Sequence, residues 1–183
     1  MRVSVSPAFV LFWTALYFFD TNGLFWALSL AVLVHELCHF AVIRFTGGEV
    51  RRLELRLNGF VIVTDGLMSY RRELICAAAG PIGSAALAFI AARLGQYALS
   101  GISGALLAFN ALPILPLDGG RIVFCAVAGL WGVSAAEKTM FLCALTVAAV
   151  SVIIWAVTGI WIFVYFAVIS CCQIFGNGVK YLV

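Results

Sequence analysis

The sequence predicts an all-α polytopic membrane protein with about six transmembrane helices, one of them interrupted, and a short β-hairpin at the cytoplasmic membrane surface. The composition predicts a membrane protein, because 64% of the residues are apolar, 10% are charged and the mean hydropathy is +1.13. These values lie far outside the range of soluble globular proteins. Apolar runs of roughly 20 residues recur along the chain, and that length crosses a ~30 Å hydrocarbon core.

The predicted spans are apolar segments separated by short polar connections. They cover residues 7–19, 24–45, 74–99, 102–131 (the interrupted one), 139–157 and 160–175. The connections at residues 20–23, 100–101 and 158–159 carry no positive charge, whereas most arginines and lysines fall on the other side. Because positive charge is retained in cytoplasmic loops, we expect a multi-pass protein of the cell membrane with both termini cytoplasmic. Residues 1–183 are expected to form a single integral membrane domain.

The one sizeable polar segment, residues 46–73, contains the sequence ELRLNGFVIV. An alternating strand leads into Asn58 and Gly59, and a nearly continuous apolar run follows. Asn-Gly suits the positive φ angles of a type I′ turn, so we expect a hairpin over about residues 50–65. The hairpin either caps the helices or contributes to function.

Two histidines and a glutamate interrupt the second apolar segment, in the sequence HELCH. Four residues turn an α-helix by about 400°, so His35 and His39 lie within ~40° of each other and ~6 Å apart along the axis. Both imidazoles can then bind one zinc ion, which favours nitrogen ligands. Glu36, next to the first ligand, can act as general base toward a water molecule. Ionisable residues inside a membrane are functional by default.

Two alternatives concern the same helix. His35, Glu36 and His39 could form a polar seam hydrogen-bonded to neighbouring helices, although a seam does not need this spacing. Cys38 is turned ~100° away from His39, and we expect it to pack rather than to bind metal. The 6 cysteines lack regular spacing, so no disulfide framework is predicted.

A third protein ligand is expected from NALPILPLDGGR, residues 110–121. Pro113 and Pro116 remove backbone donors and two glycines follow, so a helix cannot run through without a break. Broken helices at membrane depth are tolerated only where the backbone is buried in protein or lines a water-filled cavity. Asp118 lies in this break, where it can complete a zinc site, cap the helix that starts at Gly119, or do both.

HELCH, AAAGP and NALPILPLDGG, in this order, resemble the site-2 protease family of intramembrane zinc metalloproteases, and they lie within a motif-bearing core of about residues 24–131. The resemblance implies that His35, His39 and Asp118 bind Zn²⁺. It further implies that Glu36 activates water and that Asn110 helps to hold the substrate carbonyl or the developing oxyanion. The implied activity is that of a zinc metalloendopeptidase, which hydrolyses a peptide bond in or near a transmembrane segment of a membrane-associated substrate.

Within the family, the small size and the lack of a PDZ insertion resemble the bacterial sporulation branch, and we expect no CBS domain. The resemblance implies regulated intramembrane proteolysis of a pro-sigma or anti-sigma factor. The expected partners are this membrane-protein substrate, the lipid bilayer and a regulatory membrane protein. Nucleic acid is not expected, because the formal charge is only +3. One position departs from the family: many members carry asparagine three residues after the Ala-Gly-Pro motif, where this chain has Ser84.

Two other function classes stay open. The first is a non-catalytic membrane metal-binding protein or a metal transporter, although transporters usually distribute their ligands along a path across several helices. The second is a catalytically inactive relative that escorts membrane proteins, against which the presence of Glu36 weighs.

Overall fold

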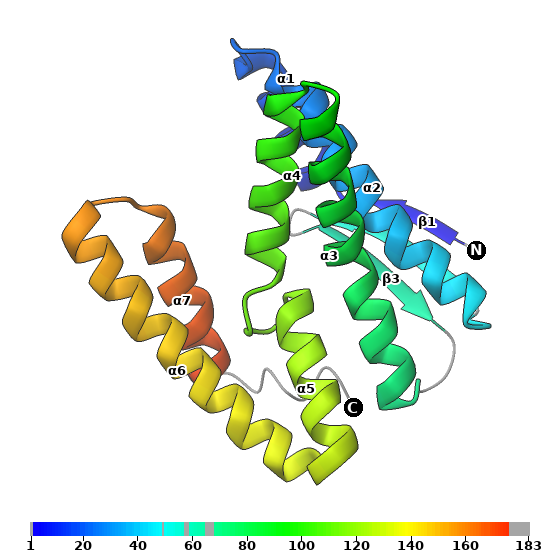
Figure 1. The fold of residues 1–183 in the computed structure, drawn as a ribbon, viewed down its shortest axis with the longest axis vertical. Coiled ribbons are helices and arrows are strands. Elements are labelled where there is room, and N and C mark those ends of the chain that lie inside the picture. Colours follow the sequence, from blue (N-terminus) through cyan, green and yellow to red (C-terminus); the bar gives the residue numbers. More distant parts are fainter. Residues whose placement is uncertain (1, 49, 57–58, 65–67, 176–183) are drawn as a thin grey trace. The chain divides into compact units, whose positions relative to one another are not determined.

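The computed structural model describes residues 2–48, 50–56, 59–64 and 68–175 (Figure 1). The elements in chain order are β1 (Arg2–Val5), α1 (Pro7–Phe19), α2 (Leu24–Phe45), β2 (Val50–Arg56), β3 (Gly59–Thr64), α3 (Tyr70–Arg93), α4 (Tyr97–Asn110), α5 (Asp118–Trp131), α6 (Val133–Thr158) and α7 (Ile162–Phe175). The chain divides into two compact units. The first comprises Met1–Leu67 and Ala79–Ala108, and the second comprises Met68–Ala78 and Phe109–Val183.

Helices dominate the described residues, in agreement with the predicted fold class. Three of them, α2, α3 and α6, have 22, 24 and 26 residues and are apolar enough to cross a membrane. The apolar helices α1, α4 and α7 have only 13 or 14 residues. At 1.5 Å per residue these extend about 20 Å, which is short of a ~30 Å hydrocarbon core. The structure therefore supports a helical membrane protein with three candidate spans, and the count of six stays a prediction.

The predicted boundaries are wrong in the middle of the chain. The turn expected at residues 100–101 lies inside α4. The chain turns instead around Gly95, whose φ of 72° lies in the left-handed region that favours glycine. The span expected at residues 102–131 starts five residues earlier, at Tyr97, but its predicted interruption is confirmed: α4 and α5 are separate helices, because Pro113 and Pro116 interrupt helical hydrogen bonding between them.

The first unit contains a three-stranded sheet with the strand order β1-β2-β3. Strands β2 and β3 are antiparallel, with Leu53 opposite Ile62, which confirms the predicted hairpin. Of the predicted Asn58-Gly59 turn, Asn58 lies outside the described residues, and Gly59 is the first residue of β3, where it pairs with Arg56. Strand β1 was not predicted, and it pairs in parallel with β2. The first strand of the hairpin is therefore the central strand of the sheet, and β3 is an edge strand.

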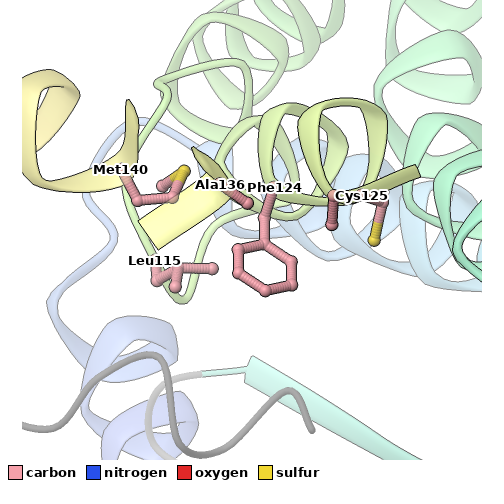
Figure 2. Packing of buried hydrophobic residues seen from close by; sticks show 6 residues of the cluster. Leu115, Phe124, Cys125, Ala136 and Met140 are labelled. Carbon is pink, nitrogen blue, oxygen red and sulfur yellow. The ribbon is translucent and has the colours of Figure 1, made fainter. Parts of the chain in front are cut away.

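The second unit has an apolar core where α5 packs on α6. Figure 2 shows the buried side chains, which come from Leu115, Phe124, Cys125, Ala128, Ala136 and Met140. Phe124 is 1% exposed, and its ring makes an edge contact with that of Tyr70 at a centroid distance of 6.4 Å. Leu115 lies in the loop before α5 and Phe124 lies in α5, so burial of both side chains in this core fixes the start of α5, where Asp118 lies.

Candidate metal centre

Helix α2 buries polar side chains and exposes apolar ones. Its buried residues recur every four positions and so share one face; they are Ala31, His35, His39 and Ile43. Other surfaces of the helix carry Leu30, Leu33 and Leu37, which are 44%, 48% and 52% exposed. This pattern inverts that of a soluble helix and suits a lipid environment, in which ionisable residues face the protein interior.

The two imidazole rings of α2 lie against each other, as their spacing predicts. Nε2 of His39 is 3.2 Å from Nε2 of His35, and the ring planes are tilted by 77°. Two nitrogens bound to one tetrahedral zinc at 2.0 to 2.1 Å would be ~3.3 Å apart. The pair therefore has the spacing that a shared zinc ion requires, and both histidines are buried, with 4% and 7% of their surface exposed.

The other ring nitrogen of His35 contacts a serine on α3. Nδ1 lies 2.9 Å from Oγ of Ser84, a residue with no exposed surface. When Nδ1 carries the proton and donates it to this hydroxyl, the lone pair of Nε2 is free for a metal. Ser84 thus occupies the position where the family resemblance expects asparagine, and it contacts a predicted ligand directly.

Two glycines on α3 let its backbone approach α2 closely. A Cβ atom on Gly80 would lie 2.7 Å from Nε2 of His35 and would overlap Nε2 of His39. A Cβ atom on Gly83, one turn later, would overlap Sγ of Cys38. The glycine of the AAAGP motif therefore leaves the space that both imidazoles need, and Cys38 packs against α3.

Glu36 follows His35 on α2 and is half-buried. A single helical step turns it ~100° from the histidine face, so it lies beside the face that carries both Nε2 atoms rather than on it. A general base next to a metal ligand occupies such a place, because it must reach the attacking water without binding the metal itself.

The other predicted site residues belong to the second unit. Asn110 is the last residue of α4 and is half-buried, and Asp118 is the first residue of α5 and is buried. The N-cap of α5 is Leu117, so the alternative role of Asp118 as the cap is wrong. Its carboxylate instead lies in the first helical turn, where the helix dipole favours negative charge. Oδ1 of Asp118 is 4.0 Å from Nη1 of Arg121, and Nη2 of the same arginine donates to Oε1 of Glu73 at 3.3 Å.

The loop before Asp118 passes close over the first turn of α5. A Cβ atom on Gly119 would lie 2.5 Å from the carbonyl carbon of Ala111, and one on Gly120 would lie 2.5 Å from that of Ile114. Any larger residue at either position would push the loop away. The two glycines after Asp118 are thus required by backbone packing, beyond the flexibility inferred from the sequence.

Two contacts escaped prediction. The sequence marked Ser84 only as a departure from the family, and Gln173 on α7 was not singled out. The side chain of Gln173 accepts a hydrogen bond from the backbone N–H of Leu115, in the loop before Asp118. A signal existed, since Gln173 is the only amide side chain in residues 160–175.

No protein-family model matches the sequence. Over 128 residues the chain is 29% identical to a zinc metalloprotease of Methanocaldococcus jannaschii. The matched region covers 61% of this chain and 38% of that relative, so the chain spans well under two thirds of the relative's length.

In three dimensions the chain is similar to a site-2 protease from Methanocaldococcus jannaschii. The TM-score is 0.64 at 22% sequence identity, and the superposition covers 99% of this chain and 90% of that structure. The chain therefore has the fold of a site-2 protease, and part of its sequence is similar to a zinc metalloprotease.

Proposed function

We propose that the chain is an intramembrane zinc metalloprotease in which His35, His39 and Asp118 hold one zinc ion. The observation that carries the proposal is the 3.2 Å spacing of the two buried Nε2 atoms. Two imidazoles and one carboxylate form a typical donor set for catalytic zinc, which keeps a fourth position open. The names of the relatives in sequence and in fold support the same chemistry.

The proposed mechanism divides the work among three kinds of residue. A bound zinc ion supplies Lewis-acid chemistry, which acidifies water and polarises a carbonyl group. Glu36 takes the proton from the water that attacks the scissile carbonyl and passes it to the leaving amine. Asn110 donates its side-chain amide to the carbonyl oxygen as negative charge develops there.

The substrate that we propose is a membrane protein with a single span, held extended by pairing with a strand edge. The central position of β2 excludes the first strand of the hairpin from this role, so the pairing edge is that of β3. Substituting proline at Val61 and, separately, at Ile62 tests pairing with β3. Consecutive backbone N–H groups point to opposite edges of a strand, so one of the two substitutions removes a donor from the free edge. One substitution should slow cleavage with zinc content unchanged, and the other should disrupt the sheet. Parental cleavage by both variants would contradict strand pairing.

The sheet and its exposed arginines bear on how the chain lies across the membrane. Strand β1 shares a sheet with the hairpin, so the N-terminus and the hairpin lie on one side of the membrane. Arg51 and Arg52 are exposed on β2, and by the positive-inside rule that side is cytoplasmic. We extend the proposal to a single multi-pass domain with about six spans and both termini cytoplasmic. Its substrate is a pro-sigma or anti-sigma factor under control of a regulatory membrane partner, as in the sporulation branch.

The decisive experiment compares the purified protein with its Glu36→Gln variant. The proposal predicts that both bind zinc stoichiometrically and that only the parent cleaves a single-span substrate. Cys38→Ala is the matched control, because Cys38 packs on Gly83 and should leave both zinc content and cleavage unchanged. Cleavage by Glu36→Gln at the parental rate would overturn the assigned base. Zinc flux into liposomes without cleavage would replace the protease by the transporter.

A further inference from the structure

Gln173 is a buried amide in a mainly apolar helix. It lies on α7, whose other residues are mostly apolar, and only 8% of its surface is exposed. An amide that is removed from water without hydrogen bonds costs roughly 2 to 7 kcal/mol, depending on the reference state. A buried amide at this position is therefore expected to form hydrogen bonds with neighbouring groups.

Both ends of the Gln173 side chain are hydrogen-bonded. Oε1 accepts from the backbone N–H of Leu115 at 2.8 Å, and Nε2 donates to the backbone carbonyl of Met140 on α6 at 3.2 Å. Leu115 belongs to the break between α4 and α5, where its N–H has no helical partner. Gln173 thus supplies the hydrogen bond that the broken helix lacks, as irregular backbone in a membrane protein requires.

The position of Leu115 is transmitted to Asp118 by backbone packing. The N–H of Leu117 donates to the carbonyl of Ile114 at 3.0 Å, which closes the loop into a tight turn. A Cβ atom on Gly120 would lie 2.8 Å from the nitrogen of Leu115, so the loop and the first turn of α5 are in contact. The side chain of Leu115 is also anchored in the core beside Phe124 and Met140 (Figure 2).

We propose that Gln173 is a positioning residue for Asp118: it fastens the loop before the aspartate to α6 and α7 and so sets where the carboxylate is held. This inference rests on the proposed function, because it assumes that Asp118 binds zinc. It assigns a role in the metal site to α7, in which the sequence indicated only hydrophobic character.

The test is the zinc affinity of the purified protein, measured by competition with a chelator. Gln173→Met keeps the length of the side chain and removes both hydrogen bonds. We expect zinc affinity to fall, by less than the about 10- to 100-fold loss typical of partners that contact a metal ligand directly. Gln173→Asn keeps the amide but is one methylene too short to span Leu115 and Met140, so it should lower affinity in the same direction. This polar variant serves if the apolar one does not fold.

Ser170→Ala is the matched control. Ser170 lies one turn earlier on α7, has no exposed surface, and its hydroxyl has no hydrogen-bond partner among the described residues. Its removal should leave zinc affinity unchanged. A loss in Ser170→Ala equal to that in Gln173→Met would reduce the effect to general damage to α7 and overturn the inference.

A double-mutant cycle separates positioning from loss of fold. In an Asp118→Ala background, Gln173→Met should cause no further loss of zinc affinity, because the ligand that it positions is already gone. Additive losses would overturn the positioning role. If Asp118→Ala itself leaves zinc affinity unchanged, the ligand set of the proposed function fails. If Asp118→Ala weakens binding and Gln173→Met does not, only the inference about Gln173 fails.

Discussion

The hydroxyl oxygen of Ser84 lies 2.9 Å from Nδ1 of His35, across the contact between α3 and α2. His35 is a predicted zinc ligand, and Ser84 is the position at which the sequence departs from the family pattern. Outer-shell partners fix the tautomer and the ring orientation of metal-binding histidines. A hydroxyl suffices for this task because it accepts one hydrogen bond at short range. Ser84 therefore contacts the predicted ligand directly, through a side chain smaller than asparagine.

Replacement of Ser84 by alanine should weaken zinc binding. The change removes the hydroxyl that contacts Nδ1 of a buried imidazole, which costs about 1 to 3 kcal/mol, and allows the ring to adopt the other tautomer. We expect zinc affinity to fall about 10- to 100-fold, measured by chelator competition. Ser103→Ala is the control, because Ser103 is equally buried and its hydroxyl has no partner among the residues described. Equal zinc affinities of both variants would show that the hydroxyl of Ser84 does not orient His35.

Gly80→Ala should abolish zinc binding at micromolar zinc. The added methyl group would overlap Nε2 of His39 and lie 2.7 Å from Nε2 of His35, so both imidazoles would have to move. Overpacking of this kind also costs about 1 to 3 kcal/mol of stability. Zinc content after dialysis, measured by elemental analysis, provides the readout.

Gly104→Ala is the matched control for this substitution. Gly104 is also helical, but a Cβ atom there meets no atom within 4 Å. The variant should bind zinc like the parent and gain up to about 1 kcal/mol in helix stability, since alanine favours the helix over glycine. Full zinc content in Gly80→Ala would remove the steric argument for the AAAGP glycine.

The predictions that agree with the structure depend on local patterns. The bounds of α1 and α2 follow from apolar runs that end at Asp20 and at Thr46, and the hairpin follows from alternation around Asn-Gly. The facing imidazoles of His35 and His39 follow from a four-residue step on one helix. In each case the partners are close in sequence, so helix or strand periodicity alone brings them together.

The features that escaped prediction depend on contacts between distant residues. Ser84 and His35 are 49 positions apart, and Leu115 and Gln173 are 58 positions apart. No local period reports such pairs. Strand β1 has only 4 residues and pairs with β2 in parallel, which requires a long connection and leaves no turn signal in the sequence. The Ser-Gly pair at residues 100–101 resembles a turn, so the sequence predicts the turn there and not at Gly95. In the structure Ser100 lies in α4 and donates its hydroxyl to the carbonyl of Ala88.

The connection between α1 and α2 should make stability depend on pH. The carboxylate of Asp20 accepts hydrogen bonds from the N–H groups of Phe25, Leu24 and Asn22, at 2.8, 3.0 and 3.2 Å. The bond from Phe25 contributes most, and together they hold the pKa of Asp20 below its ordinary value of 3.8. A lowered pKa stabilises the fold above pH 3.8, and this contribution is lost as the pH falls through the folded-state pKa. Thermal unfolding in detergent should therefore show the parent melting above Asp20→Asn at pH 6, with the difference shrinking below pH 3.8. A difference that stays constant over this range would mean that the charge of Asp20 does not stabilise the start of α2.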